Sequence, residues 1–161
     1  MNKVFFDLEW NTGFLDGNSF DEIIEIGAVK TDEEYRQIDG FRRLIRPVIY
    51  RKMNPYIQKI LAITMKDLQG EEPLASVAKA FFDWCGDCDT LIAWSGNDFG
   101  VLEKNLAHIG MKIPEQLVRY DVQMAYAYRT ENSIRNYALK TAVEAMELPE
   151  PEGQEYHDAY C

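Results

Sequence analysis

Hydrophobic residues recur with the two-residue period of β-strands in three segments near the start of the chain. These segments are residues 3–9, 21–30 and 41–46. In the second one, DEIIEIGAVK, apolar side chains alternate with Glu25 and Gly27. Because segments with turn-forming or charged residues separate these strands, the pattern predicts an antiparallel meander at the start of the fold.

The connections between these strands carry turn signals. Gly13, Gly17 and Asn18 predict the first turn, and the charged segment 31–40 predicts the second. A long proline-containing connection then follows. It ends at Thr64, which can cap a short helix in ITMKDLQG.

Helical spacing dominates the second half of the chain. The predicted elements are a helix at 73–84, a strand at 90–94, a helix within 95–111, a helix at 136–148 and a final helix from about Gly153. Residues 117–128 mix strand and helix signals and receive no assignment. Strands followed by alternating helices indicate an α/β layer architecture, and we expect one domain over residues 1–161.

Composition and charge indicate a globular protein and exclude some kinds of binding. A chain of 161 residues with 47% hydrophobic content can bury an ordinary core. The net charge of −10 argues against non-specific coating of nucleic acid, although a basic run remains in FRRLIRPVIYRK, residues 41–52. The sequence shows no apolar run long enough to cross a bilayer and no secretory signal, so we expect a cytoplasmic protein without a membrane partner.

Two of the three cysteines form a CxxC motif in FDWCGDCDT. Cys85 and Cys88 could belong to a zinc site or a redox pair. Two small, partly buried thiols at the end of a helix are the favoured interpretation, because the sequence offers no second CxxC motif.

The segment VFFDLEWNTG carries the clearest sign of chemistry. Asp7 and Glu9 are two residues apart in a predicted strand, so their side chains point to the same side. The flanking aromatic and aliphatic residues suggest that this strand is largely internal. Two carboxylates placed so closely in a poorly solvated position require a neutralising cation, and a divalent metal fits that requirement.

The order of several motifs resembles one enzyme family. FDLEWNTG, EIIEIGAV, AWSGNDFGVLEKNL, YALKTAVEAMELP and EYHDAYC follow one another along the chain. Together they resemble the DEDDh branch of the DnaQ-like 3′-to-5′ exonucleases. That resemblance implies an RNase H-like α/β fold, with a mixed central sheet that starts with three antiparallel strands and is flanked by helices.

The resemblance also implies roles for individual residues. Asp7 and Glu9 match the family's first motif, which binds two divalent ions. Asp98 matches the second-motif aspartate that supports metal binding, although it could equally cap a helix. His157 matches the general base that activates water. The expected cofactors are Mg²⁺ or Mn²⁺, because hard cations prefer oxygen ligands.

The family's last acidic ligand would follow His157 by five residues, one position after Cys161. The chain as given therefore holds three of the four carboxylates. We expect weak metal binding and a chain that stops within its last helix. Asp158 is a poor substitute because it lies about a turn before that position.

Substrate contacts are expected directly after the first motif. The resemblance points to Trp10, Asn11 and Thr12 as contacts for the terminal nucleotide. His108 is interpreted as structural. Asp121 could bring a carboxylate near the site or could lie in a loop.

The expected substrate is the 3′ end of single-stranded DNA or RNA, and a homodimer is compatible with the family. The alternative function is a catalytically impaired module of the same fold that binds nucleic acid or another protein.

Overall fold

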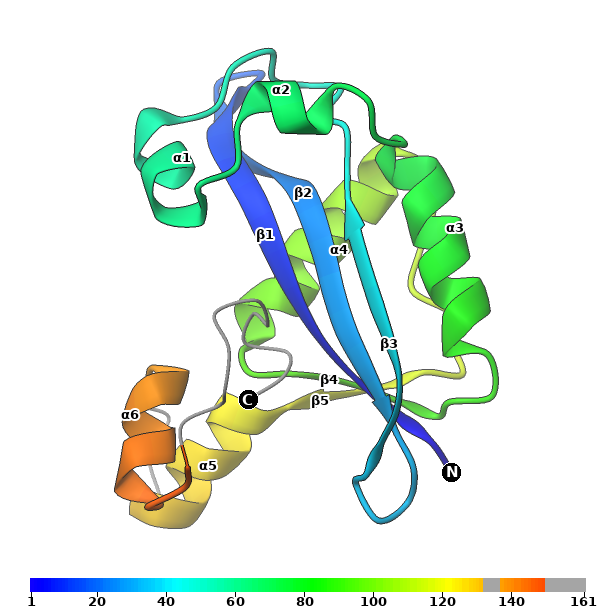
Figure 1. Ribbon diagram of the computed structural model, residues 1–161, viewed down its shortest axis with the longest axis vertical. Coiled ribbons are helices and arrows are strands. Elements are labelled where there is room, and N and C mark those ends of the chain that lie inside the picture. Colours follow the sequence, from blue (N-terminus) through cyan, green and yellow to red (C-terminus); the bar gives the residue numbers. More distant parts are fainter. Residues whose placement is uncertain (132–136, 150–161) are drawn as a thin grey trace.

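The computed structural model describes residues 1–131 and 137–149, and its centre is a mixed five-stranded sheet (Figure 1). The strands are β1 (Lys3–Leu15), β2 (Asn18–Thr31), β3 (Gln37–Leu44), β4 (Thr90–Ala93) and β5 (Val118–Asp121). Their order is β3-β2-β1-β4-β5. The first three strands pair antiparallel, whereas β4 runs parallel to both β1 and β5. This arrangement confirms the predicted α/β fold class.

The turn between β1 and β2 begins later in the chain than the sequence analysis predicted. β1 continues through Gly13, and the connection to β2 is the pair Asp16-Gly17, with φ angles of 50° and 81°. Two residues with positive φ match the twist of a tight hairpin, and Asp-Gly is a favoured pair there. Placing Gly13 in the turn was therefore wrong. Its lack of a side chain serves packing, because a Cβ there would lie 2.6 Å from the Tyr50 ring.

Six helices accompany the sheet in the described residues. They are α1 (Pro55–Leu61), α2 (Met65–Leu68), α3 (Leu74–Cys85), α4 (Gly96–His108), α5 (Val122–Glu131) and α6 (Leu139–Ala145). The sequence analysis missed α1, which begins with a proline directly after the Asn54 cap. The predicted short helix after Thr64 is confirmed as α2, with a capping box between Thr64 and Asp67.

The main hydrophobic core lies between one face of the sheet and the helices α3 and α4. Val4, Phe6 and Leu8 of β1 point into it, and the Phe6 ring lies 5.2 Å from the Phe99 ring. A smaller cluster around Ile24 lies on the opposite face, under α1 and α2. Beyond the smaller cluster, the middle of that second face carries polar residues.

A register shift in the β1–β2 pair allows two neighbouring residues of β2 to enter different cores. Glu9 pairs with Glu25 but Trp10 pairs with Ile23, so Ile24 is an extra residue on β2. This is a β-bulge, which changes the side to which the following side chains point. Ile23 accordingly joins the main core, and Ile24 joins the smaller cluster.

Cys85 and Cys88, the cysteines of the CxxC motif, are two buried thiols. Cys85 ends α3 and Cys88 follows the helix, and both are free and buried. Burial raises the pKa of the Cys85 thiol to about 12, which keeps it protonated and unreactive. The interpretation as structural thiols is therefore favoured over a zinc or redox motif.

The remaining predictions concern the C-terminal third. The unassigned residues 117–128 form β5 and the start of α5. The helix expected at 136–148 is observed as the shorter α6, and the helix expected from Gly153 lies outside the described residues. The helices of the described part are all too short or too polar to cross a lipid bilayer.

Candidate active site

Two acidic side chains share the open face of β1, as the sequence predicted. Asp7 and Glu9 are half-buried, and they alternate with Phe6 and Leu8, which point into the main core. The two carboxylates therefore lie next to each other on the face opposite α3 and α4. The neighbouring strand β2 places Gly27 opposite Asp7 and Glu25 opposite Glu9.

Glu25 adds a third carboxylate to this face, and the sequence analysis did not identify it. Its side chain is 1% exposed, and Oε1 accepts a hydrogen bond of 2.5 Å from Nε of Arg42 on β3. The charge is thus compensated by a cation from the adjacent strand. The ion pair could not be seen in the sequence, because its partners lie 17 residues apart on different strands.

Asp98 follows the strand that pairs with the other edge of β1. It lies in the first turn of α4, directly after β4, and β4 pairs in parallel with the start of β1. Its side chain is buried, and Oδ2 accepts a hydrogen bond of 3.0 Å from the Ser95 hydroxyl. The cap residue of α4 is Ser95 rather than Asp98. A carboxylate in the first turn is also favoured by the helix dipole.

Asp121 occupies the end of β5 rather than a loop. Its Oδ1 accepts a hydrogen bond of 2.9 Å from the backbone N–H of Met124, which caps α5. Its Oδ2 lies against the first residue of α4, where a Cβ at Gly96 would come within 2.9 Å. A glycine at position 96 therefore allows the ends of β4 and β5 to approach closely.

The three residues after Glu9 have different surroundings. Trp10 is partly buried against the main core, and Thr12 donates a hydrogen bond of 2.8 Å to Asp21. The Asn11 side chain is 1% exposed. It donates to the Lys52 carbonyl at 3.0 Å and accepts from the Asn54 N–H at 2.8 Å. The Asn11 amide thus fixes the chain at the start of α1.

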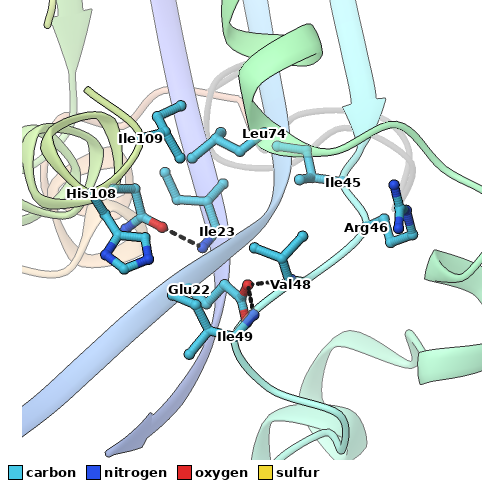
Figure 2. Close-up of a pocket in the computed structure, with 10 residues that line it drawn as sticks. Glu22, Ile23, Ile45, Arg46, Val48, Ile49, Leu74, His108 and Ile109 are labelled. Atoms are coloured by element: carbon cyan, nitrogen blue, oxygen red, sulfur yellow. Dashed lines mark hydrogen bonds between the residues drawn. The ribbon is translucent and has the colours of Figure 1, made fainter. Parts of the chain in front are cut away.

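Glu22 is a second anchor for the same connection. Its carboxylate accepts hydrogen bonds from the N–H groups of Val48, Ile49 and Tyr50, at 2.6, 2.8 and 2.9 Å. Figure 2 shows the carboxylate turned toward the backbone of this segment. Its partners lie more than 25 residues away in the chain, so sequence patterns gave no signal for this role. Glu22 and Asn11 together hold residues 48–54 over the sheet.

The donor set can be compared with the needs of a divalent cation. Asp7 and Glu9 offer adjacent carboxylate oxygens, which suit Mg²⁺ or Mn²⁺. Within residues 1–131 and 137–149, no group of three or more His, Cys, Asp or Glu side chains is arranged to hold a metal ion. His157 and Asp158 lie outside the described residues. His108 is exposed, and its ring packs 5.6 Å from that of Phe20, in agreement with a structural role.

A comparison with protein families identifies the class. The Exonuclease (RNase_T) family matches residues 4–160, so the chain belongs to this exonuclease family. A curated relative is the PolC-type DNA polymerase III of Clostridium perfringens, with 34% identity over 109 residues. The match covers 66% of this chain and 7% of that polymerase.

Solved structures support the same fold. Cell-death related nuclease 4 superimposes with a TM-score of 0.74 at 13% identity, over 99% of this chain and 60% of that one. The nuclease domain of 3′hExo, a DEDDh family member bound to rAMP, gives 0.70 at 15% identity, over 91% and 79%. Exonuclease I of E. coli in complex with a dT13 oligonucleotide gives 0.68 at 15%, over 92% and 36%. The predicted RNase H-like exonuclease fold is therefore confirmed.

Proposed function

We propose that this protein is a metal-dependent 3′-to-5′ exonuclease of the DEDDh type that hydrolyses phosphodiester bonds at the 3′ end of DNA or RNA. The observation that carries the proposal is the pair Asp7 and Glu9 on one face of β1, in a chain that belongs to an exonuclease family. The family match over residues 4–160 also supports a single domain.

The acidic residues have the chemistry that such a reaction needs. Asp7 and Glu9 would hold Mg²⁺ or Mn²⁺, with Asp98 supporting from the first turn of α4. Two such ions supply charge stabilisation and a water of lowered pKa. The buried position of Asp98 and its bond to Ser95 fix the direction of that carboxylate. His157 is proposed as the general base that accepts the proton of the attacking water.

Charge distribution supports a nucleic-acid substrate. Residues 41–66 contain seven Lys and Arg and no Asp or Glu, although the whole chain has a net charge of −10. A basic segment next to a carboxylate site can bind the backbone of one strand end. Two of the structural relatives were solved with rAMP or with an oligonucleotide. Trp10 and Thr12 are proposed as nucleotide contacts, whereas Asn11 positions the segment before α1.

The test is trimming of 5′-labelled single-stranded DNA and RNA in the presence of Mg²⁺ or Mn²⁺. We expect a ladder of products that shorten one nucleotide at a time from the 3′ end. Asp7→Asn and Glu9→Gln should each lower the rate by about 10³-fold, because each removes a charged metal ligand. Asp83→Asn, an exposed carboxylate on α3, is the matched control and should keep the full rate.

The outcome also separates the proposed enzyme from the alternative binding module. Degradation without metal, or equal activity in the Asp7→Asn and Asp83→Asn variants, contradicts the proposed site. Metal-independent binding of the oligonucleotide without any trimming would favour a module that has lost catalysis.

A further inference from the structure

A surface groove lies between the connection that follows β3 and the short helix α2. Residues 46–48, 50 and 51 of the connection line it on one side, and Met65 and Gln69 line it on the other. In Figure 1 this connection crosses the top of the molecule beside α2. The groove has a volume of about 440 Å³, which is in the range of sites that bind small organic groups.

The side chains of this groove make it basic. Arg46 and Arg51 line it, and both are exposed. Among the described residues that line the groove, none is an Asp or a Glu. The carboxylate of Glu22, which holds the same connection, accepts hydrogen bonds from the N–H groups of residues 48–50. In a protein with a net charge of −10, this basic groove therefore favours an anionic ligand.

The start of the connection is fixed to the rest of the protein. Nε of Arg46 donates a hydrogen bond of 3.1 Å to the Glu71 carbonyl, and the backbone N–H of Arg46 donates one of 2.9 Å to the Glu72 carbonyl. The three bonds to Glu22 hold the residues that follow. A ligand in the basic groove therefore meets a backbone that is already ordered, which lowers the entropic cost of binding.

Apolar and aromatic surface lies next to the two arginines. Val48 is 62% exposed, and Tyr50 and Met65 also line the basic groove. The Tyr50 hydroxyl donates a hydrogen bond of 3.0 Å to the Phe20 carbonyl, which fixes the direction of the ring. A single nucleic-acid strand presents phosphates together with bases, so it matches a surface that combines cations with apolar and aromatic groups.

The basic groove lies within a few nucleotides of the candidate metal ligands. Its residue Tyr50 packs against β1 at Gly13, four residues after Glu9. At a rise of about 3.4 Å per residue, Glu9 and Gly13 are about 14 Å apart along the strand. A stacked nucleic-acid strand advances by about 3.4 Å per nucleotide, so about four nucleotides span this distance.

We propose that the basic groove binds phosphates of the substrate strand on the 5′ side of the nucleotide that is removed. The inference rests on the proposed exonuclease function and assigns a second contact region to the same strand. Arg46 and Arg51 bind the phosphates, and Val48 and Met65 contact the sugars or bases. A substrate of about three nucleotides is too short to reach the groove.

The experiment compares two double variants in the trimming assay, Arg46→Ala with Arg51→Ala and Lys104→Ala with Arg129→Ala. Lys104 of α4 and Arg129 of α5 are exposed and lie outside the groove, so both variants lose the same charge. For an oligonucleotide of about twelve nucleotides, the groove variant should raise KM about tenfold, with kcat within about threefold of the parent. The salt dependence of KM should weaken by about two phosphate contacts. The control variant should change KM by less than about twofold.

A short substrate separates binding in the groove from a general effect of charge. For an oligonucleotide of about three nucleotides, the groove variant should leave KM within about twofold of the parent. An equal increase in KM for both lengths would overturn the proposal, and so would an equal increase in the two double variants.

A single variant removes the risk that the groove variant folds poorly. Arg51→Ala keeps the bond between Arg46 and the Glu71 carbonyl. It should still raise KM for the long oligonucleotide about threefold, and urea denaturation should give the stability of the parent. An unchanged KM in this variant would contradict the proposed phosphate contact.

A failure of the proposed function gives a different result. If the parent protein trims no substrate, binding of a fluorescent oligonucleotide of about twelve nucleotides is measured by anisotropy in the same variants. Weaker binding by the groove variant than by the control variant would still support the basic groove as a strand-binding site. Equal binding by the two variants would contradict it. Displacement of the oligonucleotide by an acidic peptide of the same charge and concentration would also contradict it, since any polyanion would then fit.

Discussion

Glu22 and Glu25 lie three residues apart on β2, and both are almost completely buried, but the protein compensates their charges in different ways. Glu22, 4% exposed, accepts hydrogen bonds from three backbone N–H groups of residues 48–50. Glu25, 1% exposed, is paired with the side chain of Arg42. The first carboxylate is bound by fixed dipoles of the chain and the second by a charged group that reaches the surface.

This difference indicates different roles for the two residues. Backbone N–H groups that donate to a buried carboxylate are no longer available to a ligand. The role of Glu22 is therefore to hold the segment before α1 in place. Glu25, by contrast, is held by a side chain that is itself 51% exposed. Burial of a charged residue therefore says little about function until the partner and its own exposure are known.

The largest expected effect is at Glu22. Glu22→Ala removes the acceptor of three N–H groups and should lower the free energy of unfolding by about 3 kcal/mol, while Glu22→Gln should lower it by about half as much. Urea denaturation measures both changes. A loss below about 1 kcal/mol for Glu22→Ala would mean that water replaces the carboxylate, and the contrast with Glu25 would disappear.

The next effect is an asymmetry within the Glu25–Arg42 pair. Arg42→Ala removes the cation that pairs with the buried carboxylate and should cost about 2 kcal/mol of stability, less than for a fully buried pair because Arg42 is half exposed. Glu25→Gln leaves a half-exposed guanidinium that water can solvate, and should cost less than about 1 kcal/mol. Urea denaturation of the two single variants tests this order. Equal losses would show that the two ends of the pair are solvated alike.

Cys85 represents a third way to accommodate a buried ionisable group, namely to keep it neutral. Burial raises its pKa from 9.0 to about 12 in the folded protein. A raised pKa means that the folded state retains the proton when the unfolded state has lost it. The associated stability is complete below about pH 9 and is lost as the pH rises toward about 12. At about pH 10 the loss is about 1.4 kcal/mol.

The contribution of Cys85 is measured as a difference between two proteins. Thermal or urea unfolding from about pH 7 to about pH 10.5 should show a steeper decline for the parent than for Cys85→Ala. This comparison removes the titration of lysines and tyrosines, which both proteins share. Parallel curves would contradict a neutral, buried thiol.

The smallest expected effect lies at the end of α1, beyond the segment that Glu22 and Asn11 hold. Ala62 caps this helix in the left-handed conformation, with φ of 54° and ψ of 18°. Glycine adopts this conformation without the steric cost of a Cβ. Ala62→Gly should therefore raise stability by about 0.5 kcal/mol, as measured by urea denaturation. The exposed Ala80 of α3 provides the control, because Ala80→Gly in the interior of a helix should lower stability by about 1 kcal/mol.

The sequence predicted the local features of the molecule well. The spacing of Asp7 and Glu9 placed both side chains on one face because the two-residue period of a strand needs no distant information. Thr64 predicted α2 for the same reason, since a capping box lies within four residues. The Asn54-Pro55 pair was an equally local signal for α1, but it was overlooked in a connection that looked irregular.

Features that depend on distant contacts could not be predicted. Asn105 of α4 accepts a hydrogen bond from the N–H of Ile23 and donates one to the Asp21 carbonyl, more than 80 residues away. Glu22 and Arg42 likewise acquire their roles only when the strands are assembled. The structure shows where Asp7, Glu9 and Asp98 lie, whereas the roles of the acidic residues and of His157 stay predictions.

The extra residue Ile24 determines what a deletion in β2 would change. In a regular strand, residues an odd number apart point to opposite sides, so Glu22 and Glu25 would be divided between the two faces. One additional residue reverses the parity, and both side chains then share the face of Asn11 and Glu9. Removing Ile24 would leave Glu22 two residues before Glu25, so a regular strand would keep the pairs of Ile23 with Trp10 and of Glu22 with Asn11. The change would instead remove the Ile24 side chain from the smaller cluster, so the extra residue lets one strand supply apolar side chains to both cores.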